Sequence, residues 1–385
     1  MKGTFSPTST SSAPSPWPVV DYQPLGRVIV APGSLSRLGE VVRGLNCSRA
    51  LLVTDPGLEA SGHPRRAERG LAEAGVSVFT FDGVKENPTE KEVLAGVSLA
   101  REYAIDCIVA VGGGSSMDCA KGINFLLTNG GKMADYKGHG KATKPMLPSV
   151  GVPTTSGTGS EAQSYALITD SSSHMKMACG DKKAAFRVSI LDPELTLSQP
   201  RMVTAVTGID AIAHAVESLV STKANPFSRM CSLAAWKHLE PNFEIVLRDP
   251  QNLPARAAMQ LGSHFAGMAI EAAMLGVCHS CANPLTAHYG LTHGTAIGVM
   301  LPHVVRFNAA GGDLYRDLNP DAESLADRIA DLIRAAGLPT RLKDFGISEG
   351  ILHLMAVEAN EQWTARFNPR VVGEAEILTI YRAAW

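Results

Sequence analysis

The chain has 385 residues, of which 45% are hydrophobic and 19% charged, and its formal net charge is −2. Because this length exceeds the roughly 250–300 residues at which one hydrophobic core stops growing, two domains are expected. There is no long lysine and arginine run and no run of roughly 18 apolar residues, so neither nucleic acid nor a membrane is an implied partner, and we expect a soluble protein with a small ligand.

The first segment, residues 5–16, reads "FSPTSTSSAPSP" and carries no charge. Such a segment cannot bury enough apolar surface to offset the entropy lost on ordering, so we expect a disordered tail over residues 1–18. It has neither the apolar centre of a secretory signal nor the arginines of a transit peptide.

From residue 26 onward, short apolar runs alternate with helix-length amphipathic stretches. The runs are "RVIVAP", "ALLVTD", "SVFTFDG" and "CIVAVGGG". Apolar runs that are each followed by a helix indicate βαβ units around a parallel sheet. We therefore predict an α/β domain over residues 19–198.

After Pro200 the sequence changes to long stretches such as "LPARAAMQLGSHFAGMAIEAAML", with apolar residues at helical spacing. We predict an all-α domain over residues 199–385. The boundary is expected within "DPELTLSQP", residues 192–200, where two prolines bracket a polar turn.

Cysteine usage bears on the compartment. The seven cysteines are odd in number and scattered, which favours a reducing compartment, and therefore the cytoplasm, over a disulfide framework. Cys278 and Cys281 have the spacing of a metal-binding pair, but no second such pair is present, and both also suit a buried apolar position.

A glycine-rich turn, "VGGGSSMDCAK" at residues 111–121, follows an apolar run and opens a helix. Its glycines let the backbone approach a ligand, and the free N–H groups of a helix start suit a phosphate. The pattern is not the GxGxxG dinucleotide fingerprint, so a tight strand-to-helix turn without a ligand is the alternative.

Two further segments are candidates for contacts with a cofactor. Asp55 ends the run "ALLVTD", where a carboxylate can bind ribose hydroxyls and repel a 2′-phosphate, although Asp-Pro-Gly is also a plain turn sequence. The loop "VGVPTTSGTGSE" at residues 150–161 offers many hydroxyls, which can bind a polar ligand or the loop's own backbone.

The segment "TGIDAIAHAVES", residues 207–218, places two polar side chains in an otherwise apolar helix. Asp210 and His214 are four residues apart and share one helix face, so both can bind one divalent ion, or simply each other. Four histidines follow within residues 276–304. Burying imidazoles in an apolar stretch is costly unless their nitrogens have partners, so some of them are candidate ligands.

Several motifs occur here in the order found in one known family. They are the GGGSxxDxAK turn at 112–121, the PTTxGTGSE loop at 153–161, the TGxDAxxHAxE helix at 207–217, the Hx13H pair at His279 and His293, and "FNPR" at 367–370. The chain thus resembles the iron-containing, metal-dependent alcohol dehydrogenases over everything after the tail. The resemblance implies a dehydroquinate synthase-like pair of domains and a homodimer.

The resemblance also implies site residues. The implied metal ligands are Asp210, His214, His279 and His293. The implied NAD-binding positions are Asp55, Asn87, Gly113, Gly114, Ser115, Asp118, Thr154, Thr155, Thr158 and Lys176.

One departure concerns proton transfer. Many family members have a histidine four residues after the third ligand, where this chain has Asn283. Because asparagine does not titrate, a proton relay must use water, the cofactor ribose or another side chain such as His288. We therefore include Asn283 and His288 among the candidate catalytic residues, and we expect His303 to be structural.

The implied activity is hydride transfer between NAD(H) and a small alcohol or aldehyde, with Fe²⁺ or Zn²⁺ polarising the substrate oxygen. A dehydroquinate synthase-like or polyol-phosphate enzyme is the nearest alternative, but it needs more basic residues near the ligands than this sequence places there. A binding protein that retains the fold without catalysis is a further alternative.

Overall fold

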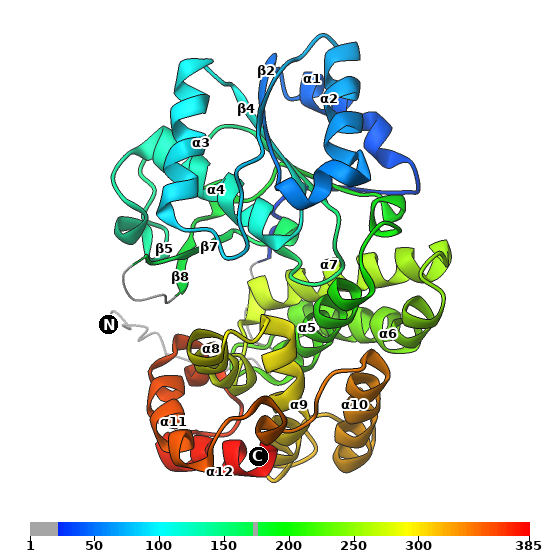
Figure 1. Ribbon diagram of the computed structural model, residues 1–385, viewed down its shortest axis with the longest axis vertical. Helices are drawn as coiled ribbons and strands as arrows, with labels where there is room; N and C mark the ends of the chain where they lie inside the picture. The colour runs from blue at the N-terminus through cyan, green and yellow to red at the C-terminus, as the bar shows by residue number, and fades with distance from the viewer. Residues whose placement is uncertain (1–21, 172–175) are drawn as a thin grey trace, which may run out of the picture.

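The computed structural model describes residues 22–171 and 176–385. The tail expected over residues 1–18 lies outside the described residues. Figure 1 shows an α/β half and a helical half, with helix α7 where the two meet. The predicted fold class, a parallel-sheet α/β domain followed by an all-α domain, is confirmed.

The α/β half is built on one parallel sheet of six strands in the order β1-β9-β6-β4-β2-β3. Its strands are β1 (Arg27–Val30), β2 (Arg49–Val53), β3 (Ser77–Phe81), β4 (Cys107–Gly112), β6 (Ser149–Pro153) and β9 (Val188–Leu191). Its main helices are α1 (Leu38–Gly44), α2 (His63–Glu73), α3 (Glu90–Glu102) and α4 (Gly114–Asn129).

Both faces of this sheet are covered, which explains why its central strands are apolar throughout. Along β4, Ile108 and Ala110 pack into a core with α3 and α4, whereas Val109 and Val111 pack into a second core with α1 and α2. This alternation follows from the two-residue period of a strand.

A second, small sheet lies beside α4 and was not predicted. Its order is β5-β8-β7, formed by Gly138–His139, Lys176–Gly180 and Tyr165–Thr169. Strand β8 runs antiparallel to β7 and parallel to β5. These strands are short, and no long apolar run marks them in the sequence.

The second half consists of eight α-helices and several short 3-10 turns. The helices are α5 (Arg201–Val220), α6 (Pro226–Arg248), α7 (Leu253–Ala273), α8 (Val277–Tyr289), α9 (His293–Ala309), α10 (Ala322–Ala336), α11 (Leu352–Glu361) and α12 (Glu374–Ala384). Helix α8 turns away from α7 by 106°.

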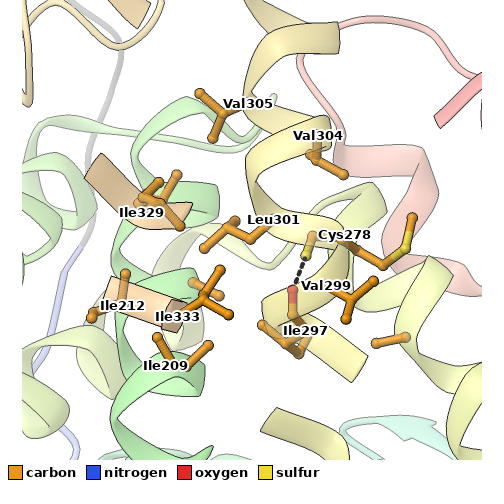
Figure 2. Packing of buried hydrophobic residues seen from close by; sticks show 14 of the residues in the cluster. Ile209, Ile212, Cys278, Ile297, Val299, Leu301, Val304, Val305, Ile329 and Ile333 are labelled. Carbon is orange, nitrogen blue, oxygen red and sulfur yellow. Dashed lines mark hydrogen bonds between the residues drawn. The ribbon is translucent and has the colours of Figure 1, made fainter. Parts of the chain in front are cut away.

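Helix α5 is the centre of this half. It is long and apolar enough to pass a test for a membrane span, but 83% of its apolar window is buried inside the protein, as in the core helix of a soluble protein. Figure 2 shows Ile209 and Ile212 of α5 packed near Ile329 and Ile333 of α10 and Leu301 of α9. The apolar faces of α5 therefore fix its position and leave one face for polar groups.

Candidate metal and cofactor site

The polar face of α5 carries three ionisable side chains, Asp210, His214 and Glu217. Spacings of four and three residues place them along one side of the helix. All three are at least nine-tenths buried, so each needs a partner in the fold.

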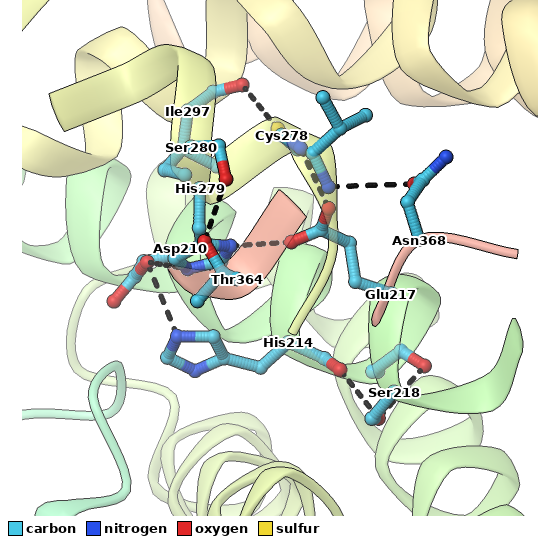
Figure 3. A network of polar contacts seen from close by, with 12 residues as sticks. Asp210, His214, Glu217, Ser218, Cys278, His279, Ser280, Ile297, Thr364 and Asn368 are labelled. Atoms are coloured by element: carbon cyan, nitrogen blue, oxygen red, sulfur yellow. Dashed lines mark hydrogen bonds and ion pairs between the residues drawn. The ribbon is translucent and has the colours of Figure 1, made fainter. Parts of the chain in front are cut away.

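Two histidines from other helices meet this face. His279 lies in the first turn of α8, and His293 is the first residue of α9. The Nε2 atom of His214 lies 3.4 Å from Asp210 Oδ1, and those of His279 and His293 each lie 3.6 Å from it. The contacts of Asp210 with His214 and His279 are drawn in Figure 3.

These separations fit a shared ion. Two ligand atoms each about 2.1 Å from one metal, at a near-tetrahedral angle, are about 3.4 Å apart. One ligand atom each from Asp210, His279 and His293 lie within 4.8 Å of one another, and His214 adjoins this group through Asp210. Among the described residues, neither Asp210 Oδ1 nor His279 Nε2 has a hydrogen-bond partner, although both are buried. A divalent cation bound between them would satisfy both atoms at once.

The charges of the site support the same conclusion. Burial would raise the pKa of Asp210, but the three histidines outweigh it and hold that pKa below its usual range. Burial lowers the pKa of His214, and it lowers the pKa of His293 to about 3. Burial opposes protonation of His279 as well, but Glu217 and Asp210 overcome it and raise the pKa of His279 to about 9. A cation would therefore compete with a proton for the His279 imidazole.

Glu217 is a site residue that the sequence analysis did not single out. Its Oε2 accepts a hydrogen bond from His279 Nδ1 at 2.5 Å, and its Oε1 accepts one from the Cys278 backbone N–H at 2.7 Å. The contact fixes the His279 tautomer and leaves Nε2 free for a metal. The spacing of Asp210, His214 and Glu217 was the signal that could have found it.

Cys278 and Cys281 do not join this group. Both are free and buried, and Cys278 Sγ contacts the Ile297 carbonyl oxygen at 3.6 Å (Figure 2). They take the apolar role that was the alternative to metal binding.

Several predicted cofactor positions lie where β2, β4 and β6 end: Asp55 follows β2, Gly113 follows β4 and Thr154 follows β6. Ser116, in the first turn of α4, donates to Asp55 Oδ2 at 3.2 Å, and the Thr154 N–H donates to the Gly112 carbonyl at 3.0 Å. A Cβ on Gly114 would lie 2.6 Å from Thr158 Cγ2, so only glycine permits this approach. A Cβ on Gly113 would likewise lie 3.2 Å from Thr155 Cγ2, so the glycine turn and the hydroxyl-rich loop lie against each other and form one continuous wall. Ser115 is the second residue of α4, directly after this turn.

Asp118 lies deeper, within α4. It accepts a hydrogen bond from Ser160 Oγ at 2.7 Å and lies 3.9 Å from the Lys121 ammonium. Lys121 is almost wholly buried and donates to the carbonyl oxygens of Ser160 and Tyr165. Lys121 is a second residue with a structural role that was missed, because its partners are some 40 residues away in the chain.

Two more predicted cofactor positions are Lys176, the first residue of β8, and Asn87. Burial lowers the pKa of Lys176, while Asp118 and Asp210 oppose that effect, so its ammonium lies within electrostatic reach of both the turn and the metal face. Asn87 has a left-handed backbone, with φ 52°, directly before Pro88.

The remaining candidates differ in position. Asn283 follows His279 by one turn of α8 and donates from Nδ2 to Gln362 Oε1 at 3.0 Å. His288 follows His279 by nine residues, which places it on the opposite face of α8, where it pairs with Glu358 at 2.6 Å. His303 is half-buried in α9, and burial lowers its pKa to about 4.

Comparisons with known proteins give a consistent result. The sequence model of the family described as "Iron-containing alcohol dehydrogenase" matches residues 26–193, and that of "Fe-containing alcohol dehydrogenase family, C-terminal" matches residues 204–385.

Individual proteins match over almost the whole chain. The 1,3-propanediol dehydrogenase of Citrobacter freundii is 37% identical over 370 residues, covering 92% of this chain and 96% of its own. The NAD-dependent methanol dehydrogenase of Bacillus methanolicus is 32% identical over 373 residues, covering 92% and 97%. A crystal structure of 1,3-propanediol oxidoreductase superposes with a TM-score of 0.91 at 35% identity, covering 96% and 100%.

The contact between Glu217 and His279 leads to a first prediction. The substitution Glu217→Gln should lower metal affinity by about 10–100-fold, because His279 loses the carboxylate that orients its imidazole. Metal content after dialysis against graded chelator concentrations measures this. The matched control is Glu73→Gln at an exposed position of α2, which should retain wild-type affinity. Equal metal retention in both variants would contradict the assigned role.

Proposed function

The chain belongs to the iron-containing alcohol dehydrogenase family and is a metal-dependent, NAD-linked alcohol dehydrogenase, and on this premise we propose that Asp210, His214, His279 and His293 hold its metal ion. The observation that carries the assignment is the meeting of three imidazole nitrogens around an unpartnered, buried Asp210 oxygen among the described residues.

A nitrogen-rich set with one carboxylate suits either Fe²⁺ or Zn²⁺. When bound, such a cation supplies Lewis-acid polarisation of an alcohol or aldehyde oxygen. Asp210 brings one negative charge to the site, and Glu217 keeps the His279 imidazole oriented toward it. The buried position of these side chains keeps bulk water away from the reacting groups.

We assign the cofactor to the wall formed by the glycine turn and the loop at 153–161. Backbone N–H groups at the start of α4 suit the pyrophosphate, and Asp55, at the end of β2, suits the adenosine ribose. Asn87, Gly113, Gly114, Ser115, Asp118, Thr154, Thr155, Thr158 and Lys176 complete the proposed contacts. Lys176, with its ammonium in reach of both Asp118 and Asp210, suits the end of the cofactor nearest the metal.

Proton transfer cannot use the side chain at position 283, because asparagine does not titrate. The Asn283 amide donates a hydrogen bond to Gln362. His288 lies on the face of α8 opposite His279 and pairs with Glu358. We therefore propose that Asn283 orients water or substrate without exchanging a proton, and that His288 takes no part in the relay.

Three further proposals concern organisation. A domain boundary at residues 198/199 is supported by the end of β9 at Leu191 and the start of α5 at Arg201. A homodimer is supported by edge strand β1, which exposes Val28 and Val30 and pairs with β9 alone among the described strands. A cytoplasmic location is supported by seven free cysteines.

The metal assignment predicts the effect of removing a ligand. His279→Ala or His293→Ala should abolish metal-dependent alcohol turnover while leaving NADH binding measurable, because the two ligands lie outside the cofactor wall. Steady-state kinetics and fluorescence titration with NADH test this, with His353→Ala at an exposed position as the control. Near-wild-type turnover by a metal-free ligand variant would disprove the assignment.

The Asp55 assignment predicts a change in cofactor preference. Asp55→Ala should raise the efficiency ratio of NADP to NAD by about tenfold, equivalent to about 1.4 kcal/mol, because a carboxylate that repels the 2′-phosphate is gone. The ratio of kcat/KM values for the two cofactors measures it, and Asp313→Ala, at an exposed site, serves as the control. An unchanged ratio would contradict the assignment and would mean that Asp55 serves only in the turn.

The asparagine at position 283 predicts a response to an added titratable group. In Asn283→His, the plot of kcat/KM against pH should show an additional change near pH 6–7. The reason is that an imidazole with an ordinary pKa of about 6.5 would then lie one turn from His279. Asn283→Gln should keep the parent profile. A histidine variant whose pH profile matches that of the parent would show that position 283 does not face the reacting groups.

A further inference from the structure

One face of α7 carries four residues that each contact the same segment of the α/β half. Gln260, His264, Gly267 and Glu271 are spaced by four, three and four residues, so they form a stripe along the helix. We call these four residues the α7 stripe. Each of them contacts the segment 153–164, which includes the hydroxyl-rich loop.

The first two contacts are side-chain hydrogen bonds. Gln260 Nε2 donates to the Pro153 carbonyl oxygen at 3.1 Å, where β6 ends and the loop begins. His264 Nδ1 lies 3.0 Å from Glu161 Oε1, and both side chains are more than nine-tenths buried. These contacts hold the two ends of the loop that carries Thr154, Thr155 and Thr158.

The next two contacts continue along the same face. A Cβ on Gly267 would lie 2.5 Å from the Gly159 carbonyl oxygen and 2.9 Å from its Cα, so the two backbones touch here. Glu271 uses both carboxylate oxygens on Ser164, accepting from its N–H at 3.0 Å and from its hydroxyl at 2.7 Å.

The loop also rests on the helix that carries Asp210. A Cβ on Gly157 would lie 2.5 Å from Thr207 Cβ and 3.0 Å from Thr207 Cα, less than one turn before Asp210. From the α/β side, Lys121 holds the same loop through Ser160. The loop is thus the segment through which the cofactor wall and the metal-bearing helices are joined.

Open space borders one end of this segment. A cavity of about 240 Å³ is lined in part by Glu161, His264 and Glu271. The hydrogen bonds of His264 with Glu161 and of Glu271 with Ser164 supply directional contacts beside this open space.

We propose that the α7 stripe positions the cofactor loop relative to the metal face, and so sets the distance between the nicotinamide and the carbon that exchanges hydride. Gln260, His264, Gly267 and Glu271 are positioning residues, since they act through the loop and do not touch the reacting atoms. This inference rests on the proposed function of the loop in binding NAD.

The close contact at Gly267 gives the expected magnitude. Ordinary contacts of a Cβ begin at 3.4 Å, whereas a Cβ here would be 2.5 Å from Gly159 O, so the loop would have to move by about 0.9 Å (3.4 − 2.5). A misplacement of about 1 Å can cost about 100-fold in rate. The neighbouring atoms belong to backbone, so the strain cannot be relieved by a side-chain rotation.

The experiment compares Gly267→Ala with Gly70→Ala in the metal-loaded enzyme. Gly70 is a matched control because it lies within helix α2 and a Cβ there meets nothing within 4 Å. We expect Gly267→Ala to lower kcat at saturating NAD by 10–100-fold with full metal content and a folded thermal transition, and Gly70→Ala to match the wild type. A kcat within twofold of wild type for Gly267→Ala would overturn the proposal.

A second set of variants covers the case in which Gly267→Ala does not fold. Glu271→Ala removes the acceptor of both hydrogen bonds with Ser164, and Ser164→Ala removes the hydroxyl donor of one of them. Each variant should lower kcat at saturating NAD several-fold. Their double variant should lose no more than Glu271→Ala alone, because that substitution already breaks both hydrogen bonds. Additive losses, or an unchanged kcat in the single variants, would overturn the proposal.

Wild-type controls separate this inference from the function on which it rests. If the wild-type enzyme neither binds NADH nor oxidises any alcohol, the proposed function fails and this inference fails with it. If the wild type does both while the α7 variants keep their kcat, this inference alone fails.

Discussion

The candidate metal site in the helical half depends on one buried carboxylate oxygen. Asp210 Oδ1 faces three imidazole nitrogens at 3.4–3.6 Å and, within the described part of the chain, has no hydrogen-bond partner. A carboxylate deprived of water is costly, and a cation shared with neutral imidazoles removes that cost. The 106° turn from α7 into α8 and the start of α9 at His293 bring His279 and His293 to α5. Glu217, which lies in α5 as Asp210 does, accepts a hydrogen bond from His279 and so orients its imidazole.

The cofactor wall and this metal face come from different halves of the chain, and the reaction requires them at a fixed separation. Parallel strands place Asp55, the glycine turn and the start of the loop at one edge of the sheet, because their carboxyl ends all lie there. The loop then leaves the sheet and lies against α5 and α7. Its glycines Gly157 and Gly159 allow this close approach to α5 and α7.

Much of this could be predicted from sequence where the signal is local. The run "CIVAVG" shows a strand buried on both faces, and the spacing of Asp210 and His214 shows half of the metal face. Contacts between distant segments leave no such signal. Glu271 and Ser164 are 107 residues apart, and a helix bearing glutamine, histidine and glutamate at this spacing would look the same if that face met solvent. His279 and His293 were identified through the family resemblance, whereas the residues alone only marked a cluster of four histidines.

The position of the metal itself tests this account most directly. Anomalous diffraction data collected at the iron and zinc absorption edges from crystals of the metal-loaded protein would locate the ion. The account predicts one strong peak per chain within about 2.0–2.3 Å of Asp210 and of the Nε2 atoms of His214, His279 and His293. A fully loaded protein whose ion lies elsewhere, for example between Cys278 and Cys281, would contradict it.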